Sequence, residues 1–407
     1  MVSVDMRTRL DADVVLIDPV TFLADELPEL LDRNGELAAR GAALVGAKAL
    51  GIDVDGVRFT LEPAHRTIRL HRGTAAARVV VELDRASFSD LVQDLQTPQT
   101  LATALVTRMA MADHFRWLKW WPVLRAIIDG RGVHKPGDID FVDPEGKRLD
   151  LSRRFTPEDA DAEMAHFLGE AGFLHLQGWW PSELMAEVSA DMDAALPRYQ
   201  PDDGRSWWAT TGDGTQRCVR MRFFQEHSPA AHDLLEDPRH LRIAALTDDG
   251  HVARTRVHGL NAIEALEKPL DVVSGISDLP WHKDCSLGRH SYDCCAMTTG
   301  ISVTGADARS GQLAVVAGSH RANLQPNFIH PYLDLPVVPL PTEPGDVTVH
   351  LSCTLHMSHA PIDTERRVMY TGFSLPGERG NPIGADLGSV RENAHRNVSQ
   401  TPAALQH

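Results

Sequence analysis

The chain has 407 residues, 43% of them hydrophobic and 24% charged, a balance typical of a globular protein with two or three domains. Its formal net charge of −16 at pH 7 argues against nucleic acid and anionic membranes as partners, because binding to those surfaces depends on clustered lysine and arginine. The five cysteines show neither a disulfide framework nor the spacing of a structural zinc site, and no apolar segment is long enough for membrane insertion, so we expect a cytoplasmic protein.

Residues 1–150 predict a small α+β domain. A helix is expected over about residues 26–49, and the alternation of apolar and polar residues over 57–62 predicts a half-buried strand. Further alternating runs follow, and residues 88–95 change to the spacing of an amphipathic helix. The stretch TIRLHRGTAAARVVVELDRASFSDLV resembles the sterol-carrier-protein-like fold, which implies an apolar tunnel for a lipid. A closed core without a ligand would give the same pattern.

Residues 151–407 predict a second domain, which begins after a polar, turn-rich passage. Thr156, followed by a proline and two acids, is typical of a helix start, and the run GFLHLQG predicts a strand after that helix. From about residue 215 the chain consists of short apolar runs separated by Gly, Pro and Asp, which is typical of a β-sandwich or jelly-roll barrel. We therefore expect a double-stranded β-helix, a cupin-like fold with flanking helices.

The stretch PWHKDC places His282 and Asp284 two residues apart within this series of strands. Side chains at positions i and i+2 of a strand point to the same side of the sheet, so the pair would converge as metal ligands do. A His-x-Asp pair also occurs by chance on surface strands. A metal site therefore requires a third ligand elsewhere in the chain.

The third ligand is sought in the stretch GDVTVHLSCTLHMSHAPIDTERRVMYTGF, which carries His350, His356 and His359. Two histidines and one carboxylate on one face of iron(II) leave adjacent positions open for a chelating 2-oxo acid and dioxygen. The distal carboxylate of such a co-substrate needs a cation, and arginine suits this role because its guanidinium offers paired donors and stays charged. The pair Arg366-Arg367 supplies candidates, but the residues alone leave the choice among the three histidines open.

Several ordered segments within residues 155–385 resemble the phytanoyl-CoA dioxygenase family of iron(II)- and 2-oxoglutarate-dependent oxygenases. The resemblance rests on GFLHLQGWW, CVRMRFF, the EKP before the His-x-Asp pair, SGQLAVVAGSH, and the Gly-Asp strand that leads to a histidine and an arginine. It implies an enzyme that uses iron(II), 2-oxoglutarate and O2 and releases succinate and carbon dioxide. The implied reaction is hydroxylation of an aliphatic carbon in a small lipophilic molecule or secondary metabolite.

The resemblance also implies roles for single residues. In the family the distal ligand lies eleven residues after the glycine of the Gly-Asp turn, which gives His356, and the co-substrate arginine lies eleven residues further on, which gives Arg367. A family serine that binds 2-oxoglutarate corresponds to Ser358, and a basic residue near the co-substrate corresponds to Arg220. The implied metal ligands are His282, Asp284 and His356.

This spacing leaves His350 as a polar strand residue and His359 as a residue beside the pocket. The sequence departs from the family pattern at SGQL, at AGSH and at Pro361, and these changes do not support an acyl-CoA substrate. Two other classes of protein remain open: a non-oxidative cupin-like metal enzyme, such as an isomerase or hydrolase, and a non-catalytic lipid-binding protein. Desaturation, ring closure and epimerisation share the first half of the oxygenase reaction and remain open as well.

Overall fold

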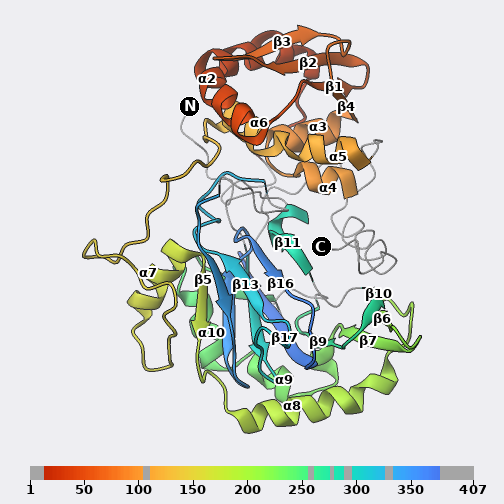
Figure 1. Ribbon diagram of the computed structural model, residues 1–407, viewed down its shortest axis with the longest axis vertical. Helices are drawn as coiled ribbons and strands as arrows, with labels where there is room; N and C mark the ends of the chain where they lie inside the picture. Colours follow the sequence, from red (N-terminus) through yellow and green to blue (C-terminus); the bar gives the residue numbers. More distant parts are fainter. Residues whose placement is uncertain are drawn as a thin grey trace.

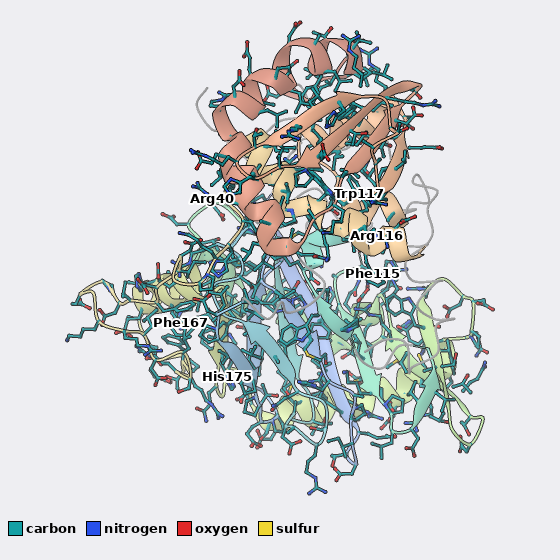
Figure 2. The ribbon with its side chains drawn as sticks, turned by 45° about the horizontal axis from the view of Figure 1, so that its top comes forward. Arg40, Phe115, Arg116, Trp117, Phe167 and His175 are labelled. Atoms are coloured by element: carbon teal, nitrogen blue, oxygen red, sulfur yellow. The ribbon has the colours of Figure 1, made fainter. Side chains whose placement is uncertain are left out.

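The computed structural model describes residues 13–103, 111–254, 261–275, 279–287, 296–325 and 333–375. An N-terminal unit of helices and a small sheet lies above a C-terminal unit of β-sheets and surrounding helices (Figure 1). Trp117 belongs to the first unit, whereas Phe167 and His175 belong to the second (Figure 2). None of the described helices has the length and hydropathy needed to cross a bilayer.

The N-terminal unit is an α+β structure, as predicted. Its elements are α1 (Pro19–Thr21), the π-helix η3 (Phe22–Glu26), α2 (Leu27–Val45), β1 (Leu50–Val54), β2 (Val57–Pro63), β3 (Ile68–Arg72), β4 (Val79–Leu83), α3 (Arg85–Val92), α4 (Pro98–Thr103), α5 (Met111–Leu118) and α6 (Trp120–Asp129). The sheet has the order β3-β2-β1-β4, with β1 antiparallel to β2 and parallel to β4. The longest helix, α2, packs against α6.

Local sequence explains the main elements of this unit. Helix α2 ends at Gly46, whose φ of +64° lies in the left-handed region that glycine adopts without strain. In β4 the side chains of Val79, Val81 and Leu83 are buried and the two between them are exposed, as the alternation predicts. An apolar pocket lies among these elements, and its lining fits a closed core as well as a lipid tunnel.

The C-terminal unit consists of two β-sheets with flanking helices. Its elements are α7 (Asp161–Ala171), β5 (Phe173–Leu176), α8 (Ser182–Ala195), η4 (Leu196–Arg198), β6 (Ser206–Thr211), β7 (Gln216–Met221), η5 (Phe224–Glu226), α9 (Pro229–Leu234), α10 (Pro238–Ala245), β8 (Val252–Ala253), β9 (Glu264–Lys268), β10 (Val272–Ser274), β11 (Leu279–His282), η7 (Asp284–Leu287), β12 (Ala296–Ser302), β13 (Leu313–Val316), β14 (Val337–Leu340), β15 (Val347–Leu351), β16 (His356–Ser358) and β17 (Arg366–Ser374). The large sheet has the order β10-β6-β7-β9-β17-β12-β15-β5, with β8 also paired to β17, and the small sheet has the order β11-β16-β13-β14. This arrangement confirms the predicted double-stranded β-helix.

The two faces of the large sheet have different surroundings. On β17, Arg367 bonds to α8, and Phe373 lies in the hydrophobic core that α8 helps to form. Successive side chains of a strand point to opposite faces, so Arg366, Tyr370 and Gly372 share the other side. Arg366 donates a hydrogen bond to β16 of the small sheet, so this side faces the small sheet. We call it the inner face.

Polar contacts join the two units. Asn323 of the C-terminal unit donates hydrogen bonds of 2.9 Å to the backbone carbonyls of Pro122 and Arg131. The His134 ring lies 2.9 Å from the Asp334 carboxylate. Helix α4 packs against η7. The N-terminal unit is therefore in contact with the turn that carries the predicted carboxylate ligand.

The hydrophobic cores of the two units do not overlap in sequence. The first ends at Val133, and the buried residues of the second begin at Phe155. The connecting segment, 134–154, packs Phe141 onto the second core. We propose that the domain boundary, expected near residue 150, falls within this segment.

Candidate metal centre

Two histidines meet where strands β11 and β16 pair. His282 ends β11 and His356 begins β16, the two are register partners, and their ring centroids lie 4.2 Å apart. Nδ1 of His282 lies 2.7 Å from the carbonyl oxygen of Pro280, and Nδ1 of His356 lies 2.9 Å from that of Thr354. Because a carbonyl oxygen can only accept, each Nδ1 carries a proton, and each Nε2 lone pair is directed elsewhere and can bind a metal.

The carboxylate comes from a turn and not from a strand. Asp284 begins the 3₁₀ turn η7, so strand alternation is not what brings it to the histidines. Its Oδ1 atom lies 3.4 Å from Nε2 of His282 and 3.5 Å from Nε2 of His356. One ligand atom from each of the three residues lies within 4.8 Å of the others. The structure thus brings the three predicted ligands together.

The second carboxylate oxygen of Asp284 faces the large sheet. Oγ1 of Thr298 on β12 donates a hydrogen bond of 2.9 Å to Oδ2, and Nε2 of His350 on β15 lies 3.4 Å from the same atom. His350 is 1% exposed, and neither of its ring nitrogens has another partner of good geometry in the described part of the chain. With Oδ2 engaged by these two residues, Oδ1 is the oxygen that faces the histidines.

The charges at the centre suit a divalent cation. Burial alone would raise the pKa of the Asp284 carboxyl, but the imidazoles of His356, His282 and His350 together hold it well below its ordinary value. Burial, with help from His350 and His282, holds the pKa of His356 well below its ordinary value. The carboxylate is therefore charged and the imidazole neutral near pH 7, which are the forms that bind metals.

The donor set fits iron(II). Two imidazoles and one carboxylate are the protein ligands of non-haem iron oxygenases, in which the remaining positions stay open. The residue between the first two ligands does not interfere, because Nζ of Lys283 points away and donates to the carbonyl of Ser319 over 2.9 Å.

A buried arginine lies next to this centre on the inner face. Arg366 is 4% exposed, its Nη2 donates to Oγ of Ser358 over 3.2 Å, and no described carboxylate is paired with it. Burial lowers the pKa of its guanidinium. Lys268, its register partner on β9, is 5% exposed, so two cations lie side by side in the interior. A buried guanidinium without a carboxylate partner is unfavourable, and a bound carboxylate would compensate for that cost.

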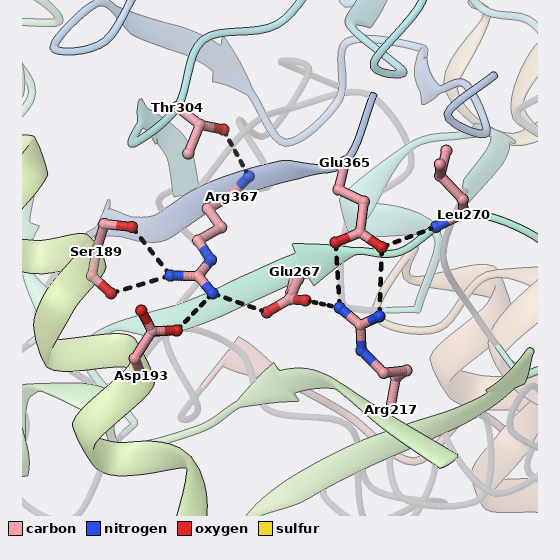
Figure 3. A network of polar contacts seen from close by, with 8 residues as sticks. All are labelled: Ser189, Asp193, Arg217, Glu267, Leu270, Thr304, Glu365 and Arg367. Atoms are coloured by element: carbon pink, nitrogen blue, oxygen red, sulfur yellow. Dashed lines mark hydrogen bonds and ion pairs between the residues drawn. The ribbon is translucent and has the colours of Figure 1, made fainter. Parts of the chain in front are cut away.

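Arg367, the predicted co-substrate residue, extends toward Ser189 and Asp193 of α8 (Figure 3). Its Nη1 donates to the carbonyl and the hydroxyl oxygens of Ser189, both over 3.0 Å, and its Nη2 lies 2.6 Å from Asp193 and 3.4 Å from Glu267. The structure does not bring it to the metal ligands. The side chain that reaches Ser358 belongs to the neighbouring Arg366.

Of the other predicted co-substrate residues, one lies at the centre and one lies apart. Ser358 is buried on β16 with its hydroxyl against Arg366. Arg220 lies on the inner face of β7, but its Nε is 2.8 Å from the Glu264 carboxylate and its guanidinium stacks 4.2 Å from the Trp207 ring. It contacts none of the described metal ligands.

Three residues of the centre were not predicted as such. Thr298 carried no signal in the sequence. His350 was interpreted as a polar strand residue. It lies two residues from Thr348 on β15, so both side chains point to the inner face, the side on which the metal ligands lie. Lys268 is the lysine of the EKP segment, and its Nζ donates to the backbone carbonyl of His359 over 2.7 Å. A register assignment for β9, β15 and β17 would have found the last two.

Comparisons with known proteins address the fold and the family. No curated protein matches the chain by sequence. The epimerase SnoN, solved with Fe3+, alpha ketoglutarate and nogalamycin RO, is 19% identical, with a TM-score of 0.41 over 55% of this chain and 95% of SnoN. EctD from S. alaskensis, solved with 2-oxoglutarate and 5-hydroxyectoine, is 17% identical, with a TM-score of 0.45 over 62% of this chain and 90% of EctD. AviO1 from Streptomyces viridochromogenes is 21% identical, with a TM-score of 0.40 over 55% of this chain and 98% of AviO1.

The family comparison identifies the C-terminal unit. The sequence profile of phytanoyl-CoA dioxygenase matches residues 168–368, a span that begins in α7 and ends in β17. It therefore includes all three residues of the metal cluster and Arg366. Residues 168–368, just under half of the chain, match the phytanoyl-CoA dioxygenase family, and this match together with the metal cluster points to a 2-oxoglutarate-dependent oxygenase.

Proposed function

We propose that this protein is an iron(II)- and 2-oxoglutarate-dependent dioxygenase that hydroxylates an aliphatic carbon of a small lipophilic molecule or secondary metabolite. The observation that carries the proposal is the cluster of His282, Asp284 and His356 next to the buried Arg366, which has no carboxylate partner among the described residues. A metal enzyme that uses no 2-oxo acid would need the cluster but not the arginine.

Different residues of the chain would bind the metal and the co-substrate. His282 and His356 would hold iron(II) through Nε2 and Asp284 through Oδ1, the atoms that face one another. Arg366 and Ser358 would bind the distal carboxylate of 2-oxoglutarate through charge-assisted hydrogen bonds. Bound iron supplies the oxidation of 2-oxoglutarate by dioxygen to succinate and carbon dioxide, coupled to oxidation of the substrate.

Thr298 and His350 would control how the carboxylate binds. Both face Oδ2 of Asp284, so this oxygen is held away from the two histidine ligands, His282 and His356. A carboxylate that binds through one oxygen leaves more coordination positions for the co-substrates than one that binds through two. We propose that the two residues serve this purpose.

The first test is the binding of the co-substrate to the metal. Anaerobic protein loaded with iron(II) should develop a visible metal-to-ligand charge-transfer band on addition of 2-oxoglutarate. His356→Ala should abolish it, whereas His359→Ala, which changes a residue outside the described metal cluster, should retain it. A wild-type protein that binds iron but gives no band would contradict the proposal.

The second test is the product. Candidate lipophilic substrates are added under oxygen, succinate is quantified, and the organic product is analysed by mass spectrometry. Hydroxylation predicts the gain of one oxygen atom for each succinate formed. Loss of two hydrogens would indicate desaturation or ring closure, and an unchanged mass with changed stereochemistry would indicate epimerisation.

A further inference from the structure

Arg254 points into the same interior from the other end of β17. It follows β8, in which Ala253 pairs with Phe373 of β17. Phe373 faces the helices, so the next residue of β8, Arg254, comes opposite Gly372 on the inner face. A Cβ atom placed on Gly372 would lie 3.3 Å from Cζ and from Nη2 of Arg254. The guanidinium therefore lies against Gly372, and the missing side chain of this glycine leaves room for it.

This position is close to the metal ligands. Gly372 is the register partner of Thr298 on β12. Thr298 in turn donates the 2.9 Å hydrogen bond to Asp284. Arg254 thus lies beside the pair of register partners Gly372 and Thr298, and Thr298 bonds to the carboxylate ligand. Both lie on the inner face of the large sheet.

Arg254 has no anionic partner among the residues that the structure describes. Other half-buried arginines of this acidic chain are paired with carboxylates, for example Arg217 with Glu267 and Arg220 with Glu264. Arg254 is half-buried, and it has neither a hydrogen bond nor an ion pair within the described residues. A guanidinium withdrawn from water without a partner is unfavourable, and a bound anion would compensate for that cost.

The distal carboxylate of the co-substrate does not account for this arginine. Arg366 and Gly372 are six residues apart on β17, so their Cα atoms are separated by about 20 Å at about 3.3 Å per residue. The guanidinium of Arg366 is held by its hydrogen bond to Ser358, whereas the guanidinium of Arg254 lies against Gly372. The distal carboxylate of 2-oxoglutarate, bound at Arg366, therefore does not pair with Arg254, and the opposite end of the molecule would be held by the metal.

We propose that Arg254 binds an anionic oxygen group of the substrate, a carboxylate or a phosphate, and that the enzyme consequently acts on lipophilic acids. The inference rests on the proposed function and specifies its substrate class. The guanidinium offers paired donors that match either group. The guanidinium of Arg254, close to Thr298 and its partner Asp284, would hold the acid end of the substrate near the metal. A carbon of the attached chain would then be presented for oxidation.

The test compares probes that differ only in charge. Decanoate, decyl phosphate and decanamide are titrated into the anaerobic complex of protein, iron(II) and 2-oxoglutarate, and binding is followed by the change in the charge-transfer band. The acids should bind at least about tenfold more tightly than the amide, as expected for a charge-assisted contact. Comparison of decanoate with decyl phosphate identifies which anionic group is preferred.

Variants of the arginine assign the effect. Arg254→Gln should remove the preference for acids, and Arg254→Lys should restore part of it. Arg154→Gln, which changes an exposed arginine, should leave the preference unchanged. Equal binding of acids and amide, no binding of either acid, or a preference that survives in Arg254→Gln would each overturn the proposal. If the charge-transfer band still forms in Arg254→Gln, the proposed function holds even where the acid preference fails. A wild-type protein that gives no band would refute both proposals.

Discussion

Replacing Arg366 with leucine should weaken 2-oxoglutarate binding without lowering the stability of the free protein. A charge-assisted contact with a carboxylate is worth about 1.5–3 kcal/mol, so the dissociation constant should rise about 10-fold to 150-fold. Without the co-substrate, the buried guanidinium has no carboxylate partner among the described residues. Its burial cost is then uncompensated, so an apolar side chain of similar length should leave the unfolding temperature unchanged or raise it.

The neighbouring residue provides a matched control with the opposite outcome. Arg367 donates to Ser189 and bonds to Asp193 and Glu267 on the outer side of the sheet. Its side chain is 21% exposed, so these ion pairs are partly screened, and Arg367→Leu should cost about 1 kcal/mol of stability. Because the side chain points away from the metal cluster, the affinity for 2-oxoglutarate should not change.

Both quantities come from the same samples. Anaerobic titration of the iron(II) protein with 2-oxoglutarate, followed by the charge-transfer band, gives the dissociation constant, and thermal unfolding without co-substrate gives the stability. A large loss of affinity in Arg367→Leu together with little change in Arg366→Leu would refute the register on which the site is built. Equal losses in both would show that the arginines act through the fold.

Other substitutions test the rest of the centre. His282→Ala and His356→Ala should each abolish stoichiometric iron binding, measured by metal analysis after desalting, because two protein ligands are too few; retention of one iron per chain would remove the residue from the ligand set. His350→Phe and Thr298→Val should each lower iron affinity about 10-fold, since residues that orient a ligand typically contribute 10-fold to 100-fold; unchanged affinity in both would show that Oδ2 of Asp284 needs no partner. Asn323→Ala should lower the free energy of unfolding by about 1–3 kcal/mol by leaving two backbone carbonyls of the N-terminal unit without their donor, and an unchanged unfolding temperature would show that this contact between units contributes nothing.

Elements with a strong period were predictable from the sequence. The helix expected over residues 26–49 occupies Leu27–Val45, and the strands of the first unit follow the alternation of their apolar residues. The end of the helix was placed a few residues late because Gly46 carried the stop signal and the apolar residues continue beyond it. Periodicity reports which side chains need burial, whereas a helix ends where the backbone changes conformation.

The ligands were predictable only with the help of the family spacing. Composition and alternation left His350, His356 and His359 as equal candidates, and the geometry now groups His356 with the other two ligands. His350 faces the same carboxylate from the large sheet, so it shares the centre without being part of the three-residue cluster. Long-range pairing of strands decides such a choice, and a single sequence does not contain it.

The placement of the arginine pair differs from the residue count for a specific physical reason. Counting residues between two strands assumes that the connecting loop has the length found in relatives, and one residue of difference reverses the face on which a strand residue lies. Between His356 and β17 the chain passes through a loop in which Ile362 and Thr364 are exposed, and such loops tolerate changes in length. At Arg366-Arg367 either neighbour satisfied the chemistry, so only the register could distinguish them.

The net charge of the chain does not reveal how its cations are distributed in the interior. A formal charge of −16 describes a sum over the whole chain, in which many arginines, such as Arg217 and Arg367, are paired with nearby acids. Arg366, Lys268 and Arg254 lie on a single face because of the pairing among β8, β9 and β17, and no carboxylate is bound to the two arginines in the described structure. An acidic protein can therefore place several cations together in its interior, on the face where we propose that small anions bind.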